Sequence, residues 1–293
     1  MGAGSWTTSS FKDYSVSKGM SVSAAGVVLG MDSNQDNFKA RRLNVALDPK
    51  NVIRECCDSN EHPETIPVIL ALDVTGSMGD AAVEVAKKLN VIMTKLFENI
   101  KDVEFMIMGI GDLAYDQSPI QASQFESDIR IAEQLDKLYF EFGGGGNSYE
   151  SYSAAWYFGL YHTMLDCWNR GKKGIIITMG DEMLNPYLPV KGWHSGLADS
   201  TGDKLQGDIE TKELYKDTSE KFDIYHLNVL HDSWSRNGAE RAKKSFESVL
   251  APEHYKEVTL DTIADTIVDI VVDSTKNGST VAAPTATMGE ITW

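Results

Sequence analysis

The chain has 293 residues, of which 42% are hydrophobic, and its formal net charge of −16 corresponds to a sequence pI of about 4.8. Nucleic-acid binding needs a basic face, so this charge disfavours nucleic acid as the main partner; it favours solubility and cationic partners. No apolar run is long enough to cross a bilayer, and no secretory signal is visible, so we expect no membrane partner. Three cysteines without metal-type spacing fit free thiols in a reducing compartment, which predicts a cytoplasmic location.

Residues 1–63 form an N-terminal extension to the region with regular periodicity. Residues 1–30 are rich in Ser, Thr and Gly, and the sequence leaves open whether they form a tail, an extra strand pair or an oligomer contact. Residues 32–37 resemble a calcium-binding loop, but the glycine required at the sixth position is missing. We therefore expect a surface turn there.

The central feature is the apolar run 66–73, which predicts a strand buried on both faces. It stops at Asp73, and helical spacing begins at residue 79 and continues to residue 98. The turn between them carries Asp73, Thr75 and Ser77, whose oxygen atoms can surround one point. Such a hard oxygen set suits Mg²⁺ or Mn²⁺ rather than zinc. The alternative is an ordinary strand-to-helix turn in which Thr75 or Ser77 caps the helix.

The rest of the chain alternates strands and helices, which predicts a doubly wound α/β fold with a mainly parallel sheet and helices on both faces. In such sheets a ligand binds beyond the carboxyl ends of the strands, where the strand order reverses. The predicted strands are 103–110, 119–126 (a short edge strand), 174–179, 222–229 and 255–260, and the predicted helices are 128–140, 149–169, 211–221, 238–250 and 261–273.

Two further loops carry candidate site residues. Four consecutive glycines precede Asn147 and Ser148, and Asp181 follows the strand 174–179. A long irregular insert, residues 184–205, then carries Tyr187, Trp193 and His194. We expect these three side chains to contact a partner at the rim of the site; ordinary rim packing is the alternative.

Together, Asp73-Val-Thr75-Gly-Ser77, the glycine-rich loop and the acid after a later strand resemble the metal-ion-dependent adhesion site of von Willebrand factor type A (vWA) domains. The resemblance is to intracellular bacterial or phage members of this Rossmann-like family. It covers residues 64–275 and leaves 276–293 as a C-terminal tail. It implies that Mg²⁺ or Mn²⁺ is held by Asp73, Thr75, Ser77, Asn147, Ser148 and Asp181. The family usually has its acid where Met179 stands, so direct or water-mediated ligation by Asp181 stays open.

The function that the resemblance implies is a non-enzymatic interaction module whose ion bridges to an acidic residue of a partner protein. Cytoplasmic relatives often work beside an AAA ATPase of the MoxR type, which is the partner class implied here. Two alternatives remain. One is a structural subunit of an assembly, an oligomer held by the N- and C-terminal extensions. The other is a metal-dependent phosphoester hydrolase, for which the sequence offers no nucleophile elbow or His-Asp metal cluster.

Overall fold

The structure is a computed structural model that describes residues 4–30, 38–141, 146–230 and 236–277, without the side chains of Ser77, Arg236 and Asn237. The turn expected at 32–37, most of the glycine run and nearly all of the C-terminal tail lie outside the described residues.

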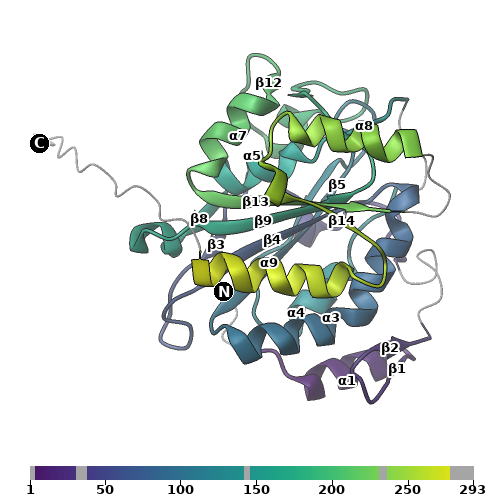
Figure 1. Ribbon diagram of the computed structural model, residues 1–293, viewed down its shortest axis with the longest axis vertical. Coiled ribbons are helices and arrows are strands. Elements are labelled where there is room, and N and C mark those ends of the chain that lie inside the picture. Colours follow the sequence, from purple (N-terminus) through teal and green to yellow (C-terminus); the bar gives the residue numbers. More distant parts are fainter. Residues whose placement is uncertain (1–3, 31–37, 142–145, 231–235, 278–293) are drawn as a thin grey trace, which may run out of the picture.

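In the described part of the chain, the main sheet has six strands in the order β14-β13-β9-β4-β5-β6 (Figure 1). All neighbouring strands are parallel except β6, which pairs antiparallel with β5 at the edge. This confirms the predicted doubly wound, mainly parallel α/β fold. The strands are β4 (Ile66–Asp73), β5 (Val103–Ile110), β6 (Ile120–Ala122), β9 (Gly174–Gly180), β13 (Phe222–Val229) and β14 (Tyr255–Val258).

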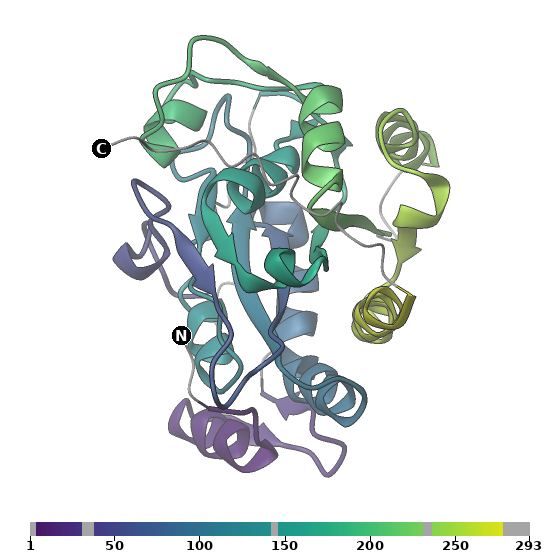
Figure 2. The same cartoon turned by 90° about the vertical axis from the view of Figure 1, so that its left-hand side faces the viewer.

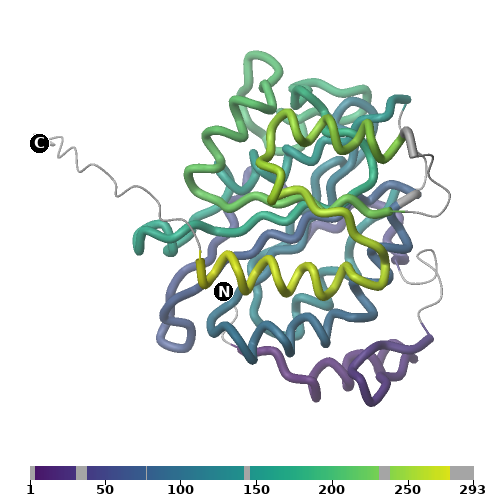
Figure 3. The backbone as a smooth tube through the Cα atoms, in the orientation of Figure 1, coloured from purple at the N-terminus to yellow at the C-terminus, as the bar shows by residue number. Residues whose placement is uncertain are grey.

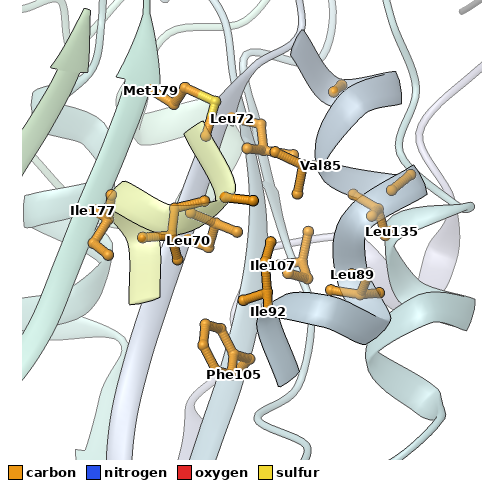
Figure 4. Packing of buried hydrophobic residues seen from close by; sticks show 14 of the residues in the cluster. Leu70, Leu72, Val85, Leu89, Ile92, Phe105, Ile107, Leu135, Ile177 and Met179 are labelled. Carbon is orange, nitrogen blue, oxygen red and sulfur yellow. The ribbon is translucent and has the colours of Figure 1, made fainter. Parts of the chain in front are cut away.

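Helices cover both faces of this sheet (Figures 1 and 2). Side chains alternate along β4, so Leu70 and Leu72 enter one hydrophobic cluster while Ile69 and Ala71 enter the other. Figure 4 shows the first cluster, in which Leu72 lies beside the helix side chain Val85 and Leu70 beside Ile177 of the paired strand β9. The first face carries α3 (Gly79–Asn99), α4 (Arg130–Leu135) and α9 (Ile263–Asn277), and the second α5 (Ser153–Tyr161), α7 (Thr211–Ser219) and α8 (Arg236–Glu247).

The described part of residues 1–30 packs against the chain's own helices (Figure 3). It contains α1 (Thr8–Ser17) and an antiparallel strand pair, β1 (Ser21–Val22) and β2 (Val28–Leu29). Trp6 Nε1 donates to Asn90 Oδ1 of α3 at 3.0 Å, and the Tyr14 hydroxyl donates to Asp136 after α4. The strand pair left open by the sequence is therefore present.

The segment that leads into β4 contains a short 3-10 turn, η1 (Val45–Leu47), and β3 (Arg54–Cys56). β3 pairs in parallel with β8 (Thr163–Leu165) rather than with the main sheet. None of the helices described is both long and apolar enough to cross a membrane.

The prediction of one helix over 149–169 is wrong, because α5 occupies only the middle of that range. The chain instead forms β7 (Tyr149–Glu150), α5, β8 and the 3-10 turn η3 (Asp166–Arg170). His162 lies where α5 ends, with Nδ1 3.0 Å from Val52 O and Nε2 2.7 Å from Asp203 Oδ2. These contacts, and the pairing of the next residues with β3, override the helical spacing of the sequence.

The helix predicted over 128–140 is also shorter, since α4 ends at Leu135. Gln121 of β6 accepts a hydrogen bond from Tyr139 N at 2.9 Å and donates one to Tyr139 O at 2.7 Å. This pair of bonds occupies backbone groups that a continued helix would need for itself. Of the other predicted elements, the strands at 66–73, 103–110 and 222–229 have the predicted bounds and the rest are present with shifted ends.

The insert 184–205 is more regular than expected. At its start β10 (Met183–Leu184) pairs with β7. Next, β11 (Tyr187–Leu188) pairs with β12 (Ile209–Glu210), which follows the insert. The insert also contains the short helix α6 (Leu197–Thr201). Two further 3-10 turns are η2 (Gly76–Met78), between β4 and α3, and η4 (Pro252–His254), before β14.

Candidate functional site

The candidate site lies at the point where the strand order reverses. From β4 the chain builds outward through β5 and β6 on one side, and later through β9, β13 and β14 on the other. Asp73 is the last residue of β4, and Asp181 directly follows the neighbouring strand β9. The two carboxylates therefore flank the switch point, where open α/β sheets bind ligands.

Asp73 is fully buried and both of its carboxylate oxygens accept hydrogen bonds. Oδ1 accepts from Thr75 N at 2.8 Å and from Thr75 Oγ1 at 2.6 Å. Oδ2 accepts from the hydroxyl of Tyr152 in the region before α5, at 2.9 Å. Burial, and then the nearby carboxylate of Asp181, raise the pKa of Asp73 to about 7. Two predicted ligands, Asp73 and Thr75, are thus in direct contact. Burial makes the negative charge of the Asp73 carboxylate costly.

Tyr152 links the ends of β4 and β9. Its hydroxyl also accepts a hydrogen bond from Glu182 N at 3.2 Å. Gly180 makes this position available, because a Cβ at residue 180 would overlap the Tyr152 hydroxyl. Tyr152 was not among the candidate residues found from the sequence. Nothing local marks it, since the contact joins residues 79 positions apart.

More carboxyl groups gather here than the sequence analysis assigned. Glu150 of β7 is 5% exposed, and among the described residues its Oε2 has no hydrogen-bond partner. Burial and the carboxylate of Asp73 raise the pKa of Glu150 well above its ordinary value. Burial also raises the pKa of Asp116, in the loop after β5, to about 7. We refer to Asp73, Asp112, Asp116, Glu150, Asp181 and Glu182 as the acidic site.

Asn147 and Ser148, predicted as ligands, are both exposed. Asn147 Nδ2 donates to Asp112 Oδ2 at 2.9 Å, and its Oδ1 accepts from Tyr149 N at 2.7 Å. Asn147 therefore holds Asp112 in place with both polar atoms of its side chain engaged. Ser148 contributes a backbone contact, its carbonyl accepting from Met183 N at 3.4 Å. From this loop it is Glu150 that brings a buried carboxylate to the site.

Ser77, the third residue of the predicted turn, lies in η2, and its side chain is outside the described residues. No three His, Cys, Asp or Glu side chains in the described part of the chain are arranged to hold a metal ion by themselves. An ion at this point would therefore need hydroxyl or water oxygens besides the carboxylates. Such a mixed oxygen set suits Mg²⁺, which keeps several waters in proteins.

The predicted partner-contact residues lie on the surface. Trp193 is 80% exposed, Tyr187 is 50% exposed, and His194 is exposed as well. The backbone holds Trp193 in place, because Trp193 N donates to Ala114 O at 2.7 Å in the loop that also carries Asp112.

Two exposed aromatic residues near the site were not singled out from the sequence. Tyr115 lies in the same loop as Asp112, and Tyr149 adjoins Glu150; both keep more than a third of their surface exposed. We call Tyr115, Tyr149, Tyr187 and Trp193 the aromatic rim. Exposed Trp and Tyr side chains on a fixed backbone are typical anchors of protein interfaces.

No protein-family model and no curated protein matches this chain. Among solved structures, it is similar to the pilus adhesin SpaC from Lactobacillus rhamnosus GG in its open conformation (14% identity, TM-score 0.47). The match covers 77% of this chain and 31% of the adhesin, so this chain spans less than a third of that protein.

It is also similar to the vWF domain of the type V pili tip protein Mfa5 from Porphyromonas gingivalis (12% identity, TM-score 0.46), over 78% of this chain and 98% of that domain. A third similar structure is a von Willebrand factor type A protein from Catenulispora acidiphila (12% identity, TM-score 0.40), over 72% and 43% of the two chains. The solved structures that this chain resembles thus include vWA-type domains. The likeness concerns the fold, and the proposals below rest on this chain's own residues.

Proposed function

We propose that this chain is a vWA-type protein-interaction module whose acidic site holds Mg²⁺ or Mn²⁺ and uses it to bind a carboxylate of a partner protein. The observation that carries the proposal is the buried Oε2 of Glu150, which has no hydrogen-bond partner among the described residues. Leaving a buried carboxylate oxygen unpaired is costly, and a cation beside it removes most of that cost.

The chemistry of the donor set fits such an ion. Asp73 and Glu150 would supply carboxylate oxygens, Thr75 and Ser77 would supply hydroxyl oxygens, and Asp181 would act through a water molecule. Thr75 Oγ1 already lies 2.6 Å from Asp73 Oδ1, so these two donors are positioned together. Tyr152 holds the other oxygen of Asp73 and so fixes the carboxylate's orientation. When bound, a divalent cation supplies positive charge and open coordination positions for an oxygen of the partner.

The aromatic rim supports a protein as the partner. Trp193 is anchored through its backbone to the loop that carries Asp112, so it presents a large apolar surface close to the acidic site. A partner carboxylate alone would meet strong repulsion on a chain with net charge −16. The ion offsets this repulsion locally, and contacts to Trp193 and Tyr187 add apolar burial.

We further propose a cytoplasmic location and an AAA ATPase of the MoxR type as the partner class; both follow from the sequence resemblance. The structural-subunit alternative, in which the extensions hold neighbouring copies, is less well supported at the N-terminus. There α1 and the β1–β2 pair are occupied with α3 and α4 of the same chain. We expect no enzymatic activity and rank the phosphoester hydrolase last.

Thermal unfolding of the full chain with MgCl₂ or MnCl₂, and with chelator, tests the ion. An ion that binds only the folded protein stabilises it by about 2.7 kcal/mol at a hundred times its Kd. Glu150→Gln keeps the shape of the side chain and removes the buried charge, so we expect higher stability without ion and loss of the ion-induced shift. Asp73→Asn should also lose the shift, whereas Asp269→Asn, on an exposed position of α9, should keep it.

An ion-induced shift of wild-type size in both Glu150→Gln and Asp73→Asn would place the ion elsewhere. No shift in the wild-type chain with either salt would remove the basis for the proposed function.

A further inference from the structure

His162 is a buried histidine at the junction of three segments of the chain. It directly follows α5 and is 5% exposed. Its Nδ1 lies 3.0 Å from Val52 O, in the segment that leads into β3, and its Nε2 lies 2.7 Å from Asp203 Oδ2, in the insert 184–205. The ring therefore joins the end of α5 to two segments that are distant in the sequence.

Both ring nitrogens of His162 face oxygens that only accept hydrogen bonds. One is a backbone carbonyl, and the other belongs to a carboxylate. Burial acts to raise the pKa of Asp203, but hydrogen bonds from the Tyr157 hydroxyl at 2.6 Å and from His162 bring it below its ordinary value, so the group is ionised. A neutral imidazole has one N–H and would point a lone pair at one of these oxygens. An imidazolium ring donates to both.

A second buried histidine has the opposite surroundings. His226 of β13 is fully buried, with Nδ1 2.9 Å from Thr178 Oγ1, and its Nε2 has no hydrogen-bond partner among the described residues. A single N–H satisfies these contacts, and burial lowers the pKa of His226 well below its ordinary value. Burial by itself thus favours a neutral ring, and the two acceptors around His162 act in the opposite direction.

Asp203 is the anionic group that faces the His162 ring. Tyr157, on α5, is neutral because burial and its hydrogen bond to Asp203 raise its pKa, and Tyr161 on the same helix is half exposed. The guanidinium of Arg54 donates to carbonyls of η1 and β6 instead of approaching Asp203. Lys204, next to Asp203 in the chain, is exposed. The charge on the ring therefore has a defined counter-ion inside the protein.

We propose that His162 is a pH-sensitive clamp, which holds the end of the insert and the segment before β3 against α5 while its ring is protonated. Histidine is the side chain whose charge ordinarily changes between about pH 5 and 8. When the proton leaves, one of the two hydrogen bonds is lost. The clamp therefore stabilises these segments at low pH and releases them as the pH rises. Tyr187 and Trp193 lie on the same insert, so the clamp also sets how firmly this part of the aromatic rim is held. It does not depend on an ion at the acidic site.

The protonation of the ring can be observed directly by NMR of the ¹⁵N-labelled full chain. An imidazolium ring carries hydrogen on both nitrogens, and a neutral ring on one. At pH 6 we expect both nitrogens of His162 to be protonated and only one nitrogen of His226. The signals of His162 are assigned by their loss in His162→Gln. A single protonated nitrogen on His162 at pH 6 would overturn the proposal.

Amide hydrogen exchange at pH 6 and pH 9, corrected for the intrinsic effect of pH, measures the release. Asn51 N donates to Thr201 O at 2.8 Å and Gly202 N to Ala198 O at 2.9 Å, so these amides report on the clamped segments. Leu250 N, which donates to Phe246 O at 2.7 Å at the end of α8, is the control. Protection of Asn51 and Gly202 should fall about tenfold or more at pH 9, the effect of losing a charged hydrogen bond, and that of Leu250 less than about twofold. Equal protection of Asn51 and Gly202 at the two pH values, or an equal fall at Leu250, would refute the clamp.

Two variants of the insert separate the clamp from other titrations. In Asp203→Asn the amide can donate to a neutral ring, so the protection of Asn51 and Gly202 should no longer depend on pH. Asp199→Asn, at an exposed position of α6, should keep the wild-type dependence. Both variants retain the acidic site, which titrates in the same range. His162→Gln should show low protection at both pH values, and Asp203→Asn provides the test if that variant does not fold. A pH dependence of wild-type size in Asp203→Asn would contradict the proposal.

Discussion

Replacing Tyr152 by Phe tests whether the hydroxyl between β4 and β9 stabilises the site. The ring stays in its buried place, and only the oxygen that donates to Asp73 Oδ2 at 2.9 Å and accepts from Glu182 N at 3.2 Å is lost. Glu182 is half-buried, so water can replace the second bond. The first bond leads to a fully buried carboxylate, so its loss leaves Oδ2 without the donor that the structure gives it.

The expected size follows from the charge of the acceptor. A hydrogen bond to a charged group contributes about 1.5–3 kcal/mol, and a neutral one about 1 kcal/mol. The pKa of Asp73 is raised to about 7, so the carboxylate is mostly charged at pH 8 and mostly protonated at pH 5.5. Tyr152→Phe should therefore lower the free energy of unfolding by about 2 kcal/mol at pH 8 and by about 1 kcal/mol at pH 5.5.

Urea unfolding at both pH values, in the presence of chelator, measures these differences. At pH 8 the melting temperature should fall by about 4–8 °C for a domain of this size. Tyr161→Phe is the matched control, since Tyr161 at the end of α5 is 52% exposed. A loss at pH 8 no larger than in the control, or a larger loss at pH 5.5 than at pH 8, would refute the reasoning.

Two further predictions concern the same region. Without divalent ions, the free energy of unfolding should fall as the pH rises from about 4 to about 7. Burial raises the pKa of Asp116 from 3.8 to about 7, so in this pH range the folded chain holds a proton that the unfolded chain has released. Urea unfolding across this range should show a smaller slope in Asp116→Asn, and an equal slope would contradict the assignment. Gly180→Ala should destabilise the chain by about 1–3 kcal/mol, because its Cβ would overlap the Tyr152 hydroxyl. The overlap includes two ring carbons of Tyr152 as well. Combining Gly180→Ala with Tyr152→Ala, which removes the ring, should therefore recover part of that loss in thermal unfolding, and strictly additive losses would argue against this overlap.

The sequence by itself determined the α/β class and the framework of the sheet. The strands predicted at 103–110 and 222–229 coincide with β5 and β13, because continuous apolar runs ending in polar turns have few other solutions. The turn after β4 was recognised for the same reason, and with it Asp73 and Thr75. These features are local, so a single sequence suffices to read them.

The tertiary structure decided which side chains accompany Asp73. Tyr152 and Glu150 reach the acidic site, whereas Asn147, three residues before Glu150 and five before Tyr152, holds Asp112 from an exposed position. The end of α5 was likewise fixed by Val52 and Asp203, which are distant in sequence. Local periodicity cannot encode such contacts, because they depend on segments that meet only once the sheet and its helices have packed.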